Sequence, residues 1–242
     1  IQPSQADYFQ TVKGGGHGDY RLITLAPSSV QEMADFVGLG FDLAFKYNNP
    51  AMILADGIIG QMMEKVVLPP FTPRRTDDEI RKECPWATLG KVGGRKRNVI
   101  TSLELDAAVM EENNLRFQAK YKKIEENEVR FQEIMCDDAE YLLVAFGSSA
   151  RICQKVVELA REQGIKLGLL RPITLWPFPT NILKEYAEKV KGMLVVELNA
   201  GQMVEDVRLA VNGKVKVEHF GRLGGIVFTP DEILHALKEK LF

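Results

Sequence analysis

The chain has 242 residues, of which 45% are hydrophobic and 26% are charged, and both fractions are ordinary for a globular protein. Its formal net charge of −2 gives no electrostatic basis for binding nucleic acid or an anionic membrane surface. No apolar run approaches the roughly 18 residues that a membrane-spanning helix needs, and no signal peptide opens the chain.

This length suffices for about two domains. The three cysteines, Cys84, Cys136 and Cys153, are odd in number, lie far apart and form no C-x-x-C pair. We therefore expect no disulfide framework and no metal site in this chain, and a reduced, cytoplasmic protein. The chain starts at Ile1 in what looks like the middle of a domain, which predicts that it is a fragment.

One strand–helix–strand unit is predicted within residues 1–70. A glycine-rich loop at residues 14–20 comes first, and it fits neither the dinucleotide-binding nor the P-loop pattern. Residues 21–26 predict a strand. Ser28 stands three residues before a Gln and Ser29 three residues before a Glu, and both spacings are those of a capping box at the start of a helix.

A second strand follows that helix. Apolar residues with helical spacing continue to about residue 46, and Asn48-Asn49-Pro50 ends the helix. Residues 51–55 predict a buried strand, and Asp56 is expected to be a turn residue. A strand, helix and strand of this length form a right-handed crossover, which is half of a doubly wound domain.

Residues 71–102 have few apolar positions and predict a long surface connection. Connections of such length are usually functional or lie against a partner. The basic run Arg95-Lys96-Arg97 is explained either as a solvated loop or as a contact for an acidic partner surface.

A long helix is predicted from residue 106 to residue 135. Its apolar stripe, which Glu128 interrupts, would pack on this chain or on a partner chain. The stripe consists of Phe117, Tyr121, Ile124, Phe131 and Met135.

Beyond that helix, short apolar runs alternate with helical patterns. This alternation predicts a parallel sheet with helices on both of its faces. The strands are predicted at residues 141–146, 165–170, 193–198 and 215–219, and the helices between Ile152 and Gly164 and at residues 181–190, 204–211 and 231–241.

The carboxyl ends of these strands carry the polar and glycine-rich residues of the module. In parallel sheets, ligands and partners meet that edge. We therefore expect a functional edge formed by Gly147-Ser148-Ser149, residues 171–174, Asn199-Ala200-Gly201-Gln202 and residues 221–225.

Several strings of the sequence resemble the α-type chain of the 2-oxoacid:ferredoxin oxidoreductases, and most closely the branched-chain (2-oxoisovalerate) members. The strings are residues 147–151, 170–179 and 197–203, and the likeness continues upstream through residues 14–20 and 25–32. It covers nearly the whole chain, and the order of the strings makes the set more specific than any one of them.

The resemblance implies an enzyme complex that oxidatively decarboxylates a 2-oxoacid, here 3-methyl-2-oxobutanoate, to an acyl-CoA and reduces ferredoxin. It implies thiamine diphosphate, Mg and iron–sulfur clusters in the whole complex, with none of them bound to this chain alone. The implied partners are a β-type subunit that carries the thiamine diphosphate and metal site, iron–sulfur and γ-type subunits, ferredoxin and CoA.

The implied fold is α/β, with part of a thiamine-diphosphate (pyrimidine-type) domain and a transketolase C-terminal-like, doubly wound parallel-sheet domain. We assign residues 1–70 to the first, residues 71–138 to the extended connection and long helix, and residues 139–242 to the second.

The family's reactive groups are not expected in this chain. Its activating Glu, a Thr in a Tyr-Pro-Ile-Thr-Pro string and a carboxylate-binding Arg lie upstream of the segment that matches Ile1. The metal–diphosphate signature is missing as well, because Ala55-Asp56-Gly57 imitates its start but no Asn pair follows at the required distance. We therefore expect the chain alone to be inactive and assign it no catalytic residue.

Secondary contributions to a site are expected from four residues. His17, in the glycine-rich loop, would orient substrate or shuttle a proton, or would be a surface or interface histidine. Arg171 would bind a phosphate or carboxylate, or brace the proline-rich loop that follows it. Asn199 and Gly201 would present an anion site at a helix start, for a CoA phosphate for example, or serve hydrogen bonding within the loop.

Three other functions stay open from the sequence. The chain would be a non-catalytic CoA- or nucleotide-binding or assembly module, or a subunit of a 2-oxoglutarate ferredoxin oxidoreductase. A transketolase or acetolactate-type thiamine enzyme is the third, and the strings at residues 176–179 and 199–202 weigh against it.

Overall fold

The computed structural model describes residues 1–88, 90–91 and 93–242. Its contacts divide the chain into two compact units. The larger unit consists of Ile1–Val67 together with Phe117–Phe242, and the smaller unit consists of Leu68–Arg116. None of the helices in the described part of the chain is both long and apolar enough to cross a membrane.

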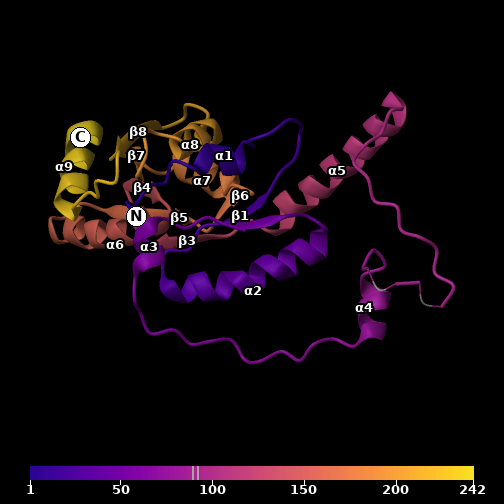
Figure 1. Cartoon of the computed structure of the whole chain (residues 1–242). Helices are drawn as coiled ribbons and strands as arrows, with labels where there is room; N and C mark the ends of the chain where they lie inside the picture. Colours follow the sequence, from indigo (N-terminus) through magenta and orange to yellow (C-terminus); the bar gives the residue numbers. More distant parts are fainter. Residues whose placement is uncertain (89, 92) are drawn as a thin grey trace. The chain divides into compact units, whose positions relative to one another are not determined.

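A five-stranded sheet forms the centre of the larger unit (Figure 1). Its order is β3-β5-β4-β7-β8, and the four strands β5, β4, β7 and β8 are parallel, as predicted. The edge strand β3, whose residues were predicted to continue the long helix, runs antiparallel to β5, so the sheet as a whole is mixed. The strands are β3 (Phe131–Ile134), β4 (Tyr141–Ala145), β5 (Leu167–Pro172), β7 (Gly192–Glu197) and β8 (Lys216–Gly221).

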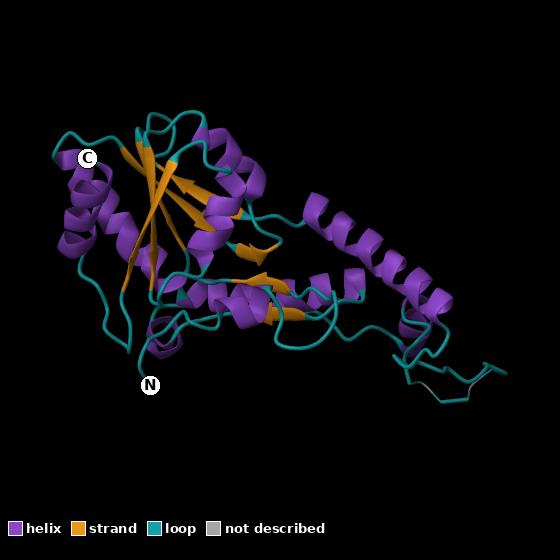
Figure 2. Ribbon diagram, turned by 90° about the horizontal axis from the view of Figure 1, so that it is seen from above, coloured by secondary structure: helices purple, strands orange, loops and turns teal. Residues whose placement is uncertain are grey.

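Different helices cover the two faces of this sheet (Figure 2). Along β4, Leu142 and Val144 belong to one core and Leu143 and Ala145 to the other, because successive side chains of a strand point to opposite faces. The prediction of helices on both faces is therefore confirmed. The helices are α7 (Thr180–Ala187) and α8 (Met203–Val211) on the first face, and α6 (Gly147–Glu162) and α9 (Pro230–Leu241) on the second.

A smaller sheet has the order β2-β1-β6. Strands β1 and β2 are parallel and are joined by α2 (Val30–Tyr47), as predicted, while β6 pairs antiparallel with β1. Because β6 follows β5 in the chain, both halves of the sequence build this sheet. The second strand was predicted to be buried, but β2 is an edge strand and only half-buried. The strands are β1 (Ile23–Leu25), β2 (Ala51–Ile53) and β6 (Thr174–Trp176).

The long helix is shorter than predicted, because α5 (Ala107–Asn127) ends before Glu128. The Glu128 side chain is buried and its Oε1 accepts hydrogen bonds from Lys46 Nζ at 2.7 Å and Tyr47 Oη at 2.6 Å, at the end of α2. Arg130 forms an ion pair with its other oxygen at 2.9 Å. These contacts fix the chain at the point where the helix stops.

The residues after Glu128 then become an edge strand of the five-stranded sheet. Phe131, which was predicted to continue the helical stripe, lies in β3 opposite Pro172 of β5. Met135, also predicted on that stripe, follows β3 and has a positive φ of 52°. Pairing with β5 therefore overrides the helical spacing of Phe131, and the bend after β3 takes Met135 out of the stripe.

The smaller unit, predicted as a surface connection, contains one helix of its own, α4 (Asp77–Glu83). A capping box starts it: Thr76 Oγ1 accepts the Glu79 N–H at 3.3 Å, and Glu79 Oε2 accepts the Thr76 N–H at 2.7 Å. No residue of this helix is buried.

Candidate functional site

The carboxyl ends of the parallel strands meet at one edge of the five-stranded sheet, which we call the strand-tip edge. Glu197 at the end of β7 lies opposite Gly221 of β8. Val144 of β4 lies opposite Leu170, the residue before Arg171. The prediction that these strand ends share one edge is confirmed.

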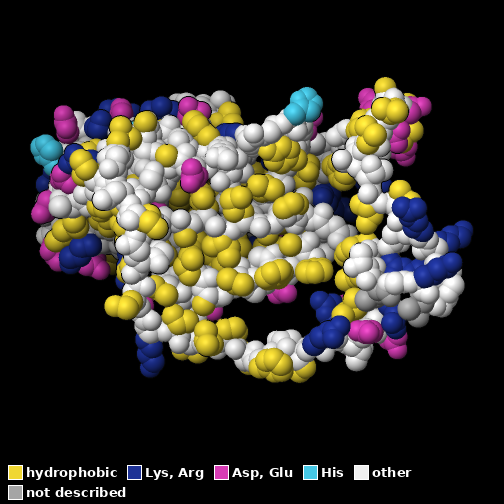
Figure 3. Space-filling model, viewed as in Figure 1, with side chains coloured by type: hydrophobic (Ala, Val, Ile, Leu, Met, Phe, Trp, Pro, Cys, Tyr) yellow, Lys and Arg dark blue, Asp and Glu magenta, His cyan; other side chains and the backbone are white. Residues whose placement is uncertain are grey.

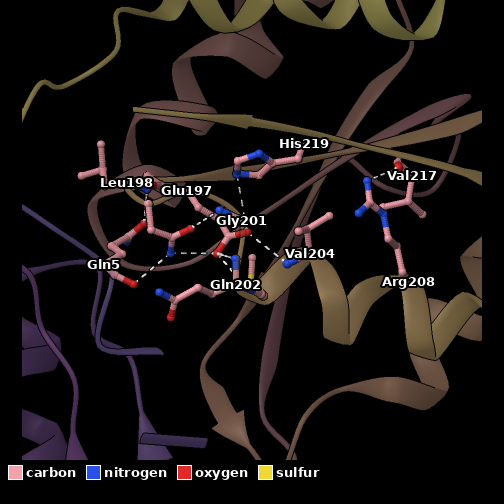
Figure 4. Close-up of polar contacts among 12 residues, drawn as sticks. Gln5, Glu197, Leu198, Gly201, Gln202, Val204, Arg208, Val217 and His219 are labelled. Carbon is pink, nitrogen blue, oxygen red and sulfur yellow. Dashed lines mark hydrogen bonds and ion pairs between the residues drawn. The ribbon is translucent and has the colours of Figure 1, made fainter. Parts of the chain in front are cut away.

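Gln5, from the N-terminal segment, is inserted into the strand-tip edge (Figure 4). Its side-chain oxygen accepts hydrogen bonds from Ser149 Oγ at 2.7 Å and from the Leu198 N–H at 3.0 Å. Its side-chain nitrogen donates to the Phe146 carbonyl at 2.9 Å, and its own carbonyl accepts from Asn199 Nδ2, also at 2.9 Å. Gln5 is 4% exposed, so these bonds form away from water.

The segment after Gln5 is attached to the same edge through α8. Gln202 Oε1 accepts the Phe9 N–H at 2.8 Å, and Gln202 Nε2 donates to the Ala6 carbonyl at 2.9 Å. Tyr8 lies in α1 (Tyr8–Val12) and donates from its hydroxyl to Asp206 at 2.6 Å. The N-terminal segment therefore covers the tips of β4 and β7.

Glu197 is a fully buried carboxylate that stabilises the start of α8. Its oxygens accept the backbone N–H groups of Met203 at 2.7 Å, Val204 at 3.0 Å and Gln202 at 3.3 Å. Asn199 Nδ2 donates to it as well, at 3.0 Å. A negative charge near these N–H groups also interacts favourably with the positive end of the helix dipole.

Burial nevertheless dominates the electrostatics of Glu197 and its neighbour His219. Loss of water raises the pKa of the Glu197 carboxyl, although the hydrogen bonds that it accepts act in the opposite direction. Burial, followed by the charges of Arg208 and Lys240, lowers the pKa of the His219 imidazole. The His219 Nε2 atom lies 3.9 Å from Glu197 Oε1 and has no hydrogen-bond partner among the described residues.

Arg171 connects the strand-tip edge to the start of α2. Its guanidinium donates to Ser28 Oγ and, at 2.7 Å, to Glu32 Oε1. Glu32 Oε2 in turn accepts the Ser28 N–H at 2.8 Å, and Ser29 Oγ accepts the Glu32 N–H at 3.2 Å, so Ser29 is the N-cap of α2 as its spacing predicts. Arg171 is only 2% exposed, and its charge pairs with Glu32 of the same chain.

Asp56, predicted as a turn residue, is the N-cap of α3 (Gly57–Gln61). Its Oδ1 accepts the Ile58 and Ile59 N–H groups at 3.0 and 3.2 Å, and its Oδ2 accepts the Ser148 N–H at 3.0 Å. Gly147 makes this contact possible. Its φ is +57°, and a Cβ there would lie 2.8 Å from Gln5 Nε2 and 3.0 Å from Asp56 Oδ2.

His17 lies apart from this network, in the exposed glycine-rich loop. The loop is held by Tyr20, whose hydroxyl accepts the Gly15 and Gly16 N–H groups at 2.8 and 2.9 Å. No hydrogen bond or ion pair connects the His17 side chain to the other described residues. Its role as a ligand-contacting residue stays a prediction.

The structure brings the other three sequence-predicted residues, Arg171, Asn199 and Gly201, to the strand-tip edge. All three already form hydrogen bonds within the chain, and the Gly201 N–H donates to Asn199 Oδ1 at 2.8 Å. Their roles in cofactor binding stay predictions. Gln5 could not be identified from the sequence, because it precedes every predicted element and its partners lie 141 to 194 residues away.

The described residues offer no cluster of ligands for the metal of thiamine diphosphate. Among the residues that the structure describes, no group of three His, Cys, Asp or Glu side chains is placed to hold a metal ion. The buried carboxylates of Asp56, Glu128 and Glu197 already accept hydrogen bonds from this chain. We therefore assign no catalytic step through that cofactor to these residues.

Two family models match almost the whole chain. The model "Pyruvate flavodoxin/ferredoxin oxidoreductase, thiamine diP-bdg" matches residues 1–135. The model "Pyruvate:ferredoxin oxidoreductase core domain II" matches residues 139–233.

Curated relatives are similar over the same length. The chain is 47% identical over 239 residues to the ketoisovalerate oxidoreductase subunit VorB of Methanothermobacter marburgensis, with 99% of this chain and 66% of that protein covered. It is 33% identical over 260 residues to the 2-oxoglutarate synthase subunit KorA of the same organism, with 97% and 68% covered. The chain thus spans about two thirds of the length of these relatives.

Among solved structures, the chain is similar in fold to a 2-oxoglutarate:ferredoxin oxidoreductase from Magnetococcus marinus, solved with 2-oxoglutarate, coenzyme A and succinyl-CoA bound. The TM-score is 0.80 at 22% identity, and 100% of this chain and 46% of that chain are covered. A split-gene transketolase matches with a TM-score of 0.50 at 12% identity, with 91% of this chain and 57% of that chain covered.

The buried Glu197 predicts a specific pH dependence. Because its pKa is raised in the folded state, the folded chain binds a proton at this position more readily than the unfolded chain does. The free energy of unfolding of the wild type, relative to Glu197→Gln, should therefore rise as the pH falls from neutral towards the ordinary glutamate pKa of 4.5. Urea unfolding of both proteins at several pH values measures this difference. A difference that is constant or shrinks on acidification would contradict it.

Arg171→Met should lower the free energy of unfolding by about 1–3 kcal/mol, because it leaves Ser28 and Glu32 without their buried cation. Arg151→Met is the matched control. The Arg151 side chain is 40% exposed in its ion pair with Glu64, and an exposed pair contributes about 0–1 kcal/mol. Urea unfolding of both variants measures the two losses in unfolding free energy, and the loss for Arg171→Met should be the larger. Equal losses would argue against a structural role for Arg171.

Proposed function

The chain belongs to the pyruvate flavodoxin/ferredoxin oxidoreductase family, and on that premise we propose that it forms part of a subunit of a 2-oxoacid oxidoreductase. The enzyme would oxidatively decarboxylate a 2-oxoacid, transfer the acyl group to CoA and pass the electrons to ferredoxin. The observation that carries this proposal is the 47% identity to a ketoisovalerate oxidoreductase subunit along 99% of the chain.

We propose 3-methyl-2-oxobutanoate as the substrate. Support comes from the difference between two relatives of the same organism, since identity falls from 47% with the ketoisovalerate subunit to 33% with the 2-oxoglutarate subunit. 2-Oxoglutarate is therefore the weaker candidate.

The proposed complex also contains the groups that these residues do not supply. We propose that a β-type subunit carries the thiamine diphosphate and Mg site, and that iron–sulfur and γ-type subunits conduct electrons to ferredoxin. Residues 1–70 would complete a pyrimidine-type domain and residues 139–242 a transketolase C-terminal-like domain. Support comes from the thiamine-binding description of the matching family model and from relatives that are themselves named as subunits.

Within this enzyme the chain would act by positioning rather than by direct chemistry. Its strand-tip edge is covered by its own N-terminal segment, and the polar side chains of that edge bond to one another. His17 is different, because its side chain is exposed in a glycine-rich loop. It is the candidate that we propose for contact with a ligand or partner.

The assembled complex, with the subunit at full length, should reduce a viologen dye when supplied with 3-methyl-2-oxobutanoate, CoA and thiamine diphosphate. We expect kcat/KM for this substrate to exceed that for 2-oxoglutarate by about tenfold or more, because an apolar pocket would leave the second carboxylate without a partner. Spectrophotometric initial rates give both values.

Omission of CoA is the control and should abolish acyl-CoA formation. Absence of dye reduction with every 2-oxoacid would refute the proposed function and favour a non-catalytic binding or assembly module. A higher kcat/KM for 2-oxoglutarate would refute the substrate alone.

A further inference from the structure

A cationic loop in the smaller unit encloses a pocket that the proposed chemistry has not used. Residues 85–103 contain four basic residues and no acidic one, although the chain as a whole has a net charge of −2. The pocket has a volume of about 1120 Å³, slightly above the range of roughly 300–1,000 Å³ that is usual for small-molecule sites. Its polar and aromatic lining includes Trp86, Lys91, Arg95, Lys96, Arg97 and Asn98.

The loop is closed by hydrogen bonds of its own. One Arg95 nitrogen, Nη2, donates to the carbonyls of Pro85 and Ala87, each at 2.7 Å, and Asn98 Nδ2 donates to the Pro85 carbonyl at 3.1 Å. Gly93 and Gly94 have φ values of +64° and +74°, which allow the backbone to turn back at this point. Arg95 is therefore occupied in building the pocket wall.

Across the described residues, the other three basic residues of the loop are free of the ion pairs that occupy basic residues elsewhere in this unit. Lys91, Lys96 and Arg97 are exposed, and within the described part of the chain no carboxylate forms an ion pair with any of them. Arg74 and Arg75, in the same unit, do pair with Asp77 and Glu83. Figure 3 shows dark-blue basic side chains concentrated in this part of the molecule.

Trp86 supplies an aromatic surface to the same pocket. Its side chain lines the cavity and is 37% exposed, so part of the indole is open to a ligand. The second tryptophan of the chain, Trp176, is 7% exposed and packs in the core of the larger unit. An accessible indole beside unpaired cations suits a ligand that combines a flat ring with several phosphates, because rings stack on aromatic side chains and Lys and Arg bind phosphate.

We propose that this loop binds a phosphorylated adenine nucleotide, with the adenine on Trp86 and the phosphates on Lys91, Lys96 and Arg97. The identity of this ligand rests on the proposed function: in a CoA-acylating enzyme it is the adenosine end of CoA, which carries a 3′-phosphate and a 5′-diphosphate. An acidic protein surface would also be attracted to these cations, but a flat contact would use neither the concave shape nor the indole.

The test uses the assembled complex and adenosine 3′,5′-bisphosphate as the probe, with affinity measured by calorimetry. Lys96→Ala combined with Arg97→Ala should weaken binding about tenfold or more, because two cations that contact phosphate are lost. The KM for CoA should rise by a similar factor, while the KM for the 2-oxoacid stays unchanged. Binding should also weaken as salt is added, since exposed charges are screened.

Two comparisons make the result specific. Lys82→Ala combined with Lys123→Ala removes the same charge from exposed helical positions outside the pocket and should leave the affinity unchanged. Trp86→Ala should weaken the nucleotide but not inorganic pyrophosphate, and Trp86→Phe should restore nucleotide binding because it keeps an aromatic ring.

Equal affinity in the loop double variant and in its control would overturn the proposal. So would equal binding of pyrophosphate and nucleotide, or binding of an acidic protein without any nucleotide binding. Failure of the proposed function has a different signature. If no 2-oxoacid supports turnover while the bisphosphate still binds in a Trp86-dependent way, the nucleotide site stands and the assignment to CoA fails with the enzyme activity.

Discussion

The larger unit depends on the attachment of the N-terminal segment to the carboxyl ends of the parallel strands. Gln5 makes that attachment with four hydrogen bonds from one amide side chain and its own carbonyl, and all of them are shielded from water. A buried polar group costs free energy unless it is hydrogen-bonded. Displacing the segment would leave these groups without partners and would therefore lower the stability of the fold. One residue thereby links the first turns of the chain to two strands of the central sheet.

The remaining polar groups of the strand-tip edge follow from that attachment. Asp56 reaches the start of α6, Arg171 reaches the start of α2, and Glu197 stabilises the start of α8. In each case a charged side chain meets the N-terminal end of a helix or its capping residues, where unpaired N–H groups or a capping serine need a partner. The edge that an open α/β sheet usually offers to ligands is therefore largely used by the chain itself.

Local patterns in the sequence predicted much of this architecture. The short apolar runs of β4 and β7 and the Ser29–Glu32 spacing before α2 depend only on neighbouring residues, and the structure agrees with both. The Ser28–Gln31 spacing does not cap the helix, because Ser28 Oγ instead accepts from Arg171. Long-range pairing was not accessible in the same way. Phe131 has helical spacing, yet Glu128 is anchored by Lys46 and Tyr47 and the chain then pairs with β5. Nothing near Gln5 in the sequence indicates its partners, whereas Arg171 and Asn199 could be placed at the edge because each follows a predicted strand.

The central claim is that Gln5 and the strand tips form one energetically coupled contact, and a double-mutant cycle tests it most directly. Unfolding free energies of the wild type, Gln5→Ala, Ser149→Ala and the double variant give the coupling between the two side chains. The hydrogen bond of 2.7 Å between them predicts a coupling energy of about 0.5–3 kcal/mol. Additive costs, with a coupling energy near zero, would show that the N-terminal segment does not hold this edge.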